Sequence, residues 1–198
     1  MPRLLIDYDP PERFVAGTVG QPGGRTFFLQ ARTGARLTSV ALEKQQMSVL
    51  AERVDELLDE VVRRSGGSAP VPALTPADAE DNEPLDTPIE EEFRVGAMSL
   101  AWDVGAERVV IECFAEGTAI EEEDDEQDEP DEEVVPDGDP DQEPDGAVLR
   151  VSISGAAARA FAKRALAVVA AGRPPCPFCS LPLDLEGHIC PRANGYRR

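Results

Sequence analysis

The stretch CPFCSLPLDLEGHICPR, residues 176–192, concentrates side chains that bind metals. It holds three of the four cysteines and the only histidine of the chain. Cys176 and Cys179 are spaced C-x2-C, and His188 and Cys190 are spaced H-x-C. Residues i and i+2 of an extended segment point to the same side, so a short hairpin brings the two pairs together. Three sulfurs and one imidazole nitrogen predict a tetrahedral Zn²⁺ site.

The predicted zinc is structural, because protein ligands fill all four positions and leave none for water or substrate. The segment has too few apolar residues to fold alone, so the metal would supply its stability. The alternative is a tail that binds no metal. The fourth cysteine, Cys113, lies in VVIECFAE and is predicted to be a buried, inert thiol, with a redox or fifth-ligand role as the alternative.

The composition indicates a soluble chain in a reducing compartment. It has 198 residues, 41% of them hydrophobic, and no apolar run long enough to span a membrane. The N-terminal MPRLLIDYDPP lacks the apolar region and cleavage site of a signal peptide. We therefore expect a cytoplasmic protein, in which cysteines bind metals or stay free.

The net charge of −20 belongs to two segments. Residues 121–145 hold 16 acidic residues, and residues 78–92 hold another 8, with no Lys or Arg in either. Of the 39 acidic residues, 15 then remain elsewhere, against all 19 basic ones, a net charge of +4. Segments 65–92 and 118–146, rich in acids and proline, are predicted to be disordered insertions that solubilise the protein, or alternatively act as an autoinhibitory strip.

The rest of the chain alternates short β-rich runs with Pro/Gly turns, followed in each half by one amphipathic helix. This order, ββββα and then βββα, predicts the α+β class: an antiparallel sheet with two helices on one face. We expect a core domain at 1–172 and a zinc-knuckle tail at 173–198. The predicted strands cover 3–8, 13–19, 25–32, 36–43, 93–103, 107–116 and 147–154, and the predicted helices cover 44–64 and 155–171.

No known catalytic motif is present. The only histidine belongs to the metal site, and neither a G-x-x-x-x-G-K-[ST] loop nor a G-x-G-x-x-G loop occurs. Asp7 and Asp9, two residues apart, form a conceivable magnesium pair, although aspartates before Pro-Pro more often form turns. The sequence favours a protein that is not an enzyme.

A second interpretation is binding of single-stranded nucleic acid. Phe27 or Phe28 on a sheet face could stack on bases, and neighbouring arginines could bind phosphates. The basic tail beside the zinc knuckle would add to this surface. The candidate residues are Arg25, Phe27, Phe28, Arg32, Arg36, Arg192, Tyr196, Arg197 and Arg198.

Three stretches, PPERFVAGTVGQPGGRTFFLQAR, VALEKQQMSVLAERVDELLDEV and CPFC…GHICPRANGYRR, resemble an uncharacterised actinobacterial domain-of-unknown-function family. The resemblance covers nearly the whole chain apart from the acidic insertions. It implies that the gene for this protein lies near genes for a predicted histidine-phosphatase-like protein and a predicted kinase-like protein. The ββββα unit, seen best over residues 25–62, also resembles the architecture of Pur-alpha and Whirly single-strand nucleic-acid binders.

Together these observations predict a cytoplasmic zinc-binding protein that acts as a non-enzymatic protein-interaction or adaptor module. The first alternative is a single-stranded nucleic-acid-binding protein of Pur-alpha or Whirly architecture. The second is an accessory subunit or enzyme in the chemistry of phosphorylated metabolites. We expect Zn²⁺ as the cofactor, a protein as the partner, and no membrane.

Overall fold

The computed structural model describes residues 4–118 and 146–172, together with Cys176, Phe178, Cys179, Cys190 and Arg192. The element order follows the prediction and confirms the α+β class. A 3₁₀ turn, Ala77–Ala79, lies between the first helix and the fifth strand. The elements are β1 (Leu4–Tyr8), β2 (Arg13–Val19), β3 (Thr26–Thr33), β4 (Arg36–Leu42), α1 (Lys44–Arg64), β5 (Glu91–Asp103), β6 (Arg108–Ala115), β7 (Ala147–Ser154) and α2 (Gly155–Ala170).

All seven strands form one sheet in the order β1-β7-β6-β5-β4-β3-β2. The prediction of an antiparallel sheet is wrong for two pairs, because β1 runs parallel to β7 and β4 runs parallel to β5. The connection from β4 to β5 contains α1, and a helical crossover of this kind joins parallel neighbours. The sheet is therefore mixed, and it contains the strands of both the ββββα half and the βββα half of the chain.

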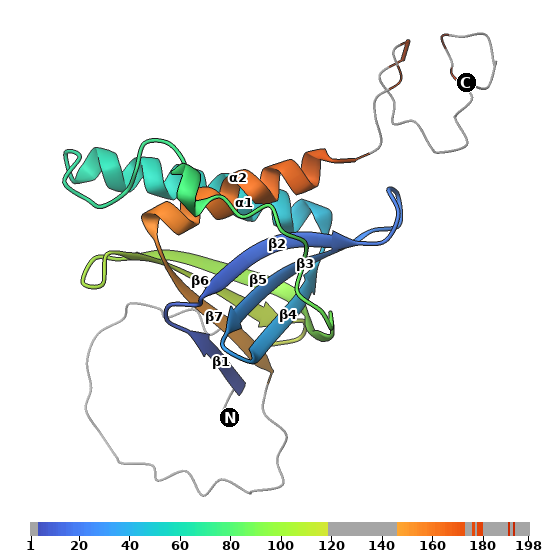
Figure 1. Cartoon of the computed structure of the whole chain (residues 1–198), viewed down its shortest axis with the longest axis horizontal. Coiled ribbons are helices and arrows are strands. Elements are labelled where there is room, and N and C mark those ends of the chain that lie inside the picture. The colour runs from blue at the N-terminus through green and yellow to red at the C-terminus, as the bar shows by residue number, and fades with distance from the viewer. Residues whose placement is uncertain are drawn as a thin grey trace, which may run out of the picture.

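The sheet is strongly curved, which follows from its topology. β1 and β2 lie at opposite edges, yet only residues 9–12 connect them. Five Cα–Cα steps span at most about 18 Å, whereas a flat seven-stranded sheet is about 29 Å wide. The edges must therefore bend toward each other (Figure 1). Accordingly, the Tyr8 hydroxyl of β1 lies 2.8 Å from the Thr38 hydroxyl of β4.

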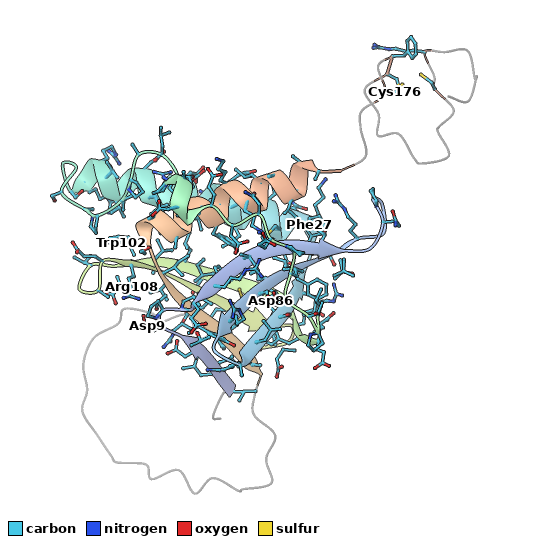
Figure 2. All side chains as sticks on the ribbon, in the orientation of Figure 1. Asp9, Phe27, Asp86, Trp102, Arg108 and Cys176 are labelled. Atoms are coloured by element: carbon cyan, nitrogen blue, oxygen red, sulfur yellow. The ribbon has the colours of Figure 1, made fainter. Side chains whose placement is uncertain are left out.

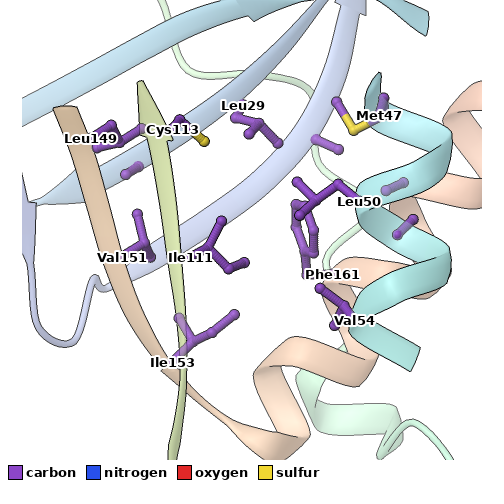
Figure 3. Close-up of a cluster of buried hydrophobic side chains, with 14 of the residues drawn as sticks. Leu29, Met47, Leu50, Val54, Ile111, Cys113, Leu149, Val151, Ile153 and Phe161 are labelled. Atoms are coloured by element: carbon purple, nitrogen blue, oxygen red, sulfur yellow. The ribbon is translucent and has the colours of Figure 1, made fainter. Parts of the chain in front are cut away.

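Both helices pack on one face of this sheet (Figure 1). The Ser154 hydroxyl caps α2 by accepting a hydrogen bond from the Ala157 N–H, and Gly66, with φ +62°, follows the end of α1. No helix within the described residues is long and apolar enough to cross a membrane. The core lies between helices and sheet (Figure 3); its labelled side chains are Leu29, Met47, Leu50, Val54, Ile111, Cys113, Leu149, Val151, Ile153 and Phe161.

Residues 65–90, which we call the strap, lead from α1 to β5. The strap follows α2, where Glu80 pairs with Lys163, and then crosses the edge strand β2. On the far side of the sheet, the backbone N–H and C=O of Asp86 both bond to the buried Gln30 side chain. The strap thus wraps around one edge of the sheet.

This arrangement differs from the prediction that residues 65–92 form a disordered insertion. The strap carries many acidic residues, but basic side chains of β2 and α2 pair with several of them. Leu85 fits over Gly17 so closely that a Cβ added at Gly17 would lie 2.5 Å from the Leu85 Cγ. Of the second predicted insertion, 118–146, residues 119–145 lie outside the described residues, and β6 and β7 on either side of it pair antiparallel.

Candidate metal centre

Three of the four predicted ligands come together. The Sγ atoms of Cys176, Cys179 and Cys190 all lie within 4.8 Å of one another, and those of Cys176 and Cys190 are 3.8 Å apart. Two sulfurs bound to one tetrahedral Zn²⁺ at about 2.3 Å are separated by about 3.8 Å. A disulfide, by contrast, has sulfurs about 2.05 Å apart. The spacing is therefore that of ligands around a metal ion, and this cluster can hold one.

Local hydrogen bonds shape the cluster. The Phe178 N–H donates to the Cys176 Sγ over 3.5 Å, and the Arg192 guanidinium donates to the Phe178 carbonyl over 3.1 Å. Burial opposes ionisation of Cys176, but the backbone N–H groups of Cys179 and Phe178 and the neighbouring thiols outweigh it and lower the pKa of this thiol. Since a metal binds the thiolate, this environment favours the ligand form. Figure 2 labels Cys176 beyond the end of α2.

Some of the other candidate residues lie outside the described residues, and Cys113 lies in the core. His188, the predicted fourth ligand, lies outside the described residues, as do Tyr196, Arg197 and Arg198. Cys113 lies in β6 with a side chain inside the core, far from any other cysteine in sequence. Burial raises the pKa of its thiol to about 12, so Cys113 stays protonated. Among the described residues, the metal-type cluster consists of Cys176, Cys179 and Cys190.

The aromatic pair proposed for nucleic-acid stacking is buried. Phe27 is 4% exposed and faces the helices, and Phe28 is 7% exposed on the opposite face, beside strand residues that the strap covers. A base stacks on an exposed ring. Neither ring therefore offers such a surface in this structure, because Phe27 packs into the core beneath the helices and Phe28 lies on the face that the strap crosses.

The three sheet arginines proposed to bind phosphate have intramolecular partners. Arg25 donates to the Ala171 carbonyl at the end of α2, and its guanidinium lies over the Phe27 ring. Arg32 pairs with Asp86 of the strap, and Arg36 donates to the Asp7 carbonyl while lying over the Tyr8 ring. These contacts hold β-strands and a helix end together. They give the nucleic-acid interpretation no support.

In the conceivable magnesium pair of Asp7 and Asp9, Asp9 already has a cationic partner. Arg108 donates to the Asp9 carboxylate over 3.1 Å, and the two residues lie close together in Figure 2. Asp7 is only in register with Arg150 of β7, whose guanidinium donates to Glu112. Since the Asp9 carboxylate already pairs with a cation, the two aspartates do not offer Mg²⁺ two free carboxylates.

A cluster of charged side chains was not predicted from the sequence. It consists of Arg13 of β2, Arg164 of α2 and Asp81 of the strap, and we call it the Asp81 clamp. Nε and Nη2 of Arg13 donate to the two carboxylate oxygens over 2.6 and 3.0 Å, and Nη1 of Arg164 donates over 2.9 Å. These residues are separated by 68 and 83 positions, and no local spacing links them. Only the folded chain brings them together.

The Asp81 clamp predicts loss of stability in acid. Hydrogen bonds from Arg13, more than any other influence, lower the pKa of Asp81 in the fold below its ordinary value of about 3.9. The ionised carboxylate therefore stabilises the fold fully above pH about 5, and this contribution is lost as pH falls through the lowered pKa. We expect urea denaturation to show a free energy of unfolding that falls below pH about 4, and less steeply in Asp81→Asn. Equal pH dependence in both proteins would contradict this.

The comparisons with known proteins place the chain at the level of a family. The family model described as "Protein of unknown function (DUF3090)" matches residues 6–190, which include both helices and all three clustered cysteines. The resemblance to an uncharacterised family is thereby confirmed, whereas its actinobacterial origin stays a prediction. No curated protein and no solved structure matches the chain. The likeness to Pur-alpha and Whirly proteins likewise stays a prediction.

Proposed function

The chain belongs to the DUF3090 family of proteins of unknown function, and we propose that it is a zinc-binding protein whose C-terminal cysteine cluster forms a structural metal knuckle and serves as a protein-interaction module. The ligands are Cys176, Cys179 and Cys190, with His188 as the fourth. The proposal places the protein in the cytoplasm, where reduced thiols remain available to a metal.

One observation carries this proposal, namely the packing of three reduced sulfurs within 4.8 Å. Three thiolates in contact repel one another, and a divalent cation between them removes this repulsion. Thiolate ligands select Zn²⁺ over the oxygen-preferring Mg²⁺ and Ca²⁺. With four protein ligands the site is closed, so its role is structural.

The exposed side chains on the knuckle support the interaction role. Phe178 lies between two ligands in the C-x2-C turn, and the residue is 43% exposed. Arg192, also exposed, donates to its carbonyl. Exposed aromatic residues and arginines are the residue types that protein interfaces favour. The metal would hold both side chains in place for a partner.

We expect the purified full-length protein to contain one Zn²⁺ per chain, and Cys176→Ser to contain almost none, as measured by elemental analysis. Cys113→Ser is the matched control. It removes a thiol from the core instead of the cluster, so it should keep the metal while lowering the stability of the core. Phe178→Ala should also keep the metal, because its backbone N–H and carbonyl remain.

Cobalt replacement provides a second readout. A chain reconstituted with Co²⁺ should show the visible absorption of a tetrahedral thiolate site, and Cys176→Ser should not. Wild-type protein that is purified under reducing conditions without any bound metal, and that takes up none from added Zn²⁺, would overturn the proposal.

A further inference from the structure

Two arginines from distant parts of the chain converge on the carboxylate of Asp81. The side chains of Arg13 and Arg164 are only 10% and 14% exposed, whereas the Asp81 side chain is 31% exposed. The Asp81 oxygens receive three guanidinium hydrogen bonds and one from the Glu83 N–H. This set of donors is the set with which proteins bind a free carboxylate or phosphate.

The carboxylate lies between two cavities. One has a volume of about 150 Å³ and is lined by Arg13, Asp81 and Arg164, with the Phe14 and Phe161 rings as apolar walls. The other has a volume of about 70 Å³ and is lined by Asp81, Arg164 and Lys163. At about 30 Å³ per water, the larger cavity has room for a small molecule next to both guanidinium groups. Asp81 is the strap residue that lines both cavities.

We propose that Arg13 and Arg164 form a binding site for a small ligand that bears a carboxylate or phosphate group, and that Asp81 of the strap fills this site when the ligand is absent. The ligand's anionic group takes the place of the Asp81 carboxylate, and the rest of the ligand lies in the larger cavity, against the stacked Phe14 and Phe161 rings. This site lies on the body of the protein and does not depend on the proposed metal knuckle.

Ligand binding then changes how the strap is held. When Asp81 gives up its arginines, the strap keeps the contacts on the far side of the sheet, where Asp86 bonds to Gln30 and Leu85 covers Gly17. The part of the strap along α2 loses the three guanidinium bonds to the Asp81 carboxylate and opens more often. The anion and the strap thus compete for the same two guanidinium groups.

Removing the internal carboxylate tests the site directly. Full-length Asp81→Ala is titrated with inorganic phosphate at constant ionic strength, and thermal unfolding is followed. We expect a saturable rise in Tm, on the order of 5 °C at roughly a hundredfold excess over the dissociation constant. Adding Arg164→Gln to this variant abolishes the rise.

Asp86→Ala is the matched control, because it also removes a strap carboxylate that bonds to Arg13 but does not line either cavity. Phosphate stabilises many proteins weakly and without saturation, and this background should appear equally in both variants. A response of Asp81→Ala no larger than that of Asp86→Ala overturns the proposal.

A measurement on wild-type protein tests the proposal even if Asp81→Ala does not fold. Glu80 directly precedes Asp81 and is a site for a Glu-specific protease, whereas Glu83 precedes Pro84 and is not cleaved. Competition predicts that phosphate speeds cleavage after Glu80 by roughly threefold or more over chloride of equal ionic strength, because proteolysis follows the population of the open strap. Unchanged cleavage overturns the proposal.

Discussion

Replacing Arg13 by alanine is expected to lower the free energy of unfolding by about 3 kcal/mol, as measured by urea denaturation. The side chain is 10% exposed and donates to Asp81, to Asp86 and to two strap carbonyls. Removing it leaves these acceptors without their donors. The expected loss is at the low end for buried pairs, because Asp81 and Asp86 each keep about a third of their surface in water.

Arg53→Ala is the control for Arg13→Ala. Arg53 also forms an ion pair, with Glu56 at 2.8 Å, but both side chains are well exposed. Exposed pairs of this kind contribute little, so the change should stay within about 0.5 kcal/mol. Equal stability of the two variants would mean that the strap does not depend on the Asp81 clamp.

Phe161→Ala should cost still more, about 4 kcal/mol of the free energy of unfolding. The ring is 2% exposed and stacks on the Phe14 ring with centroids 4.7 Å apart, so it fastens α2 to the edge strand β2. It also lines the cavity of about 150 Å³, which its removal would enlarge. Neighbours that cannot collapse into the added space account for the size of the effect.

Leu74→Ala provides the comparison for Phe161→Ala, because Leu74 is also apolar but is 83% exposed on the strap. Its truncation should change the free energy of unfolding by no more than about 0.5 kcal/mol. Phe161→Leu should lose only about half as much stability as Phe161→Ala. A Phe161→Ala protein that unfolds at the same urea concentration as wild type would show that α2 is held by other contacts.

The sequence predicted the elements well because each has a local signal. The apolar stripe of α1, the Ser154 cap of α2 and the glycine turns all depend on residues only a few positions apart. Strand direction has no such signal, since a β-strand has the same period of two in parallel and antiparallel pairs. The two parallel pairs were therefore missed.

The strap was mispredicted for a related reason. Its proline and acid content indicates disorder when the segment is judged alone. The strap is ordered by basic side chains of β2 and α2 that pair with its carboxylates, namely Arg13, Lys163 and Arg164. Phe28 pairs with Gly17, over which Leu85 of the same segment lies. The approach of Cys176, Cys179 and Cys190, in contrast, was predictable, because metal-binding cysteines occur in short, recognisable spacings.

The pairing of the first strand with the last has a consequence for the time course of folding. Leu4 pairs with Ala147, so the strand made first must wait for nearly three quarters of the 198-residue chain before its partner exists. At synthesis rates of about 5–20 residues per second, this delay lasts roughly 7–30 s. During translation, β2, β3, β4 and α1 can associate locally, whereas β1 stays an unpaired apolar segment. Until β7 is made, β1 is therefore expected to be exposed to aggregation and to chaperone binding.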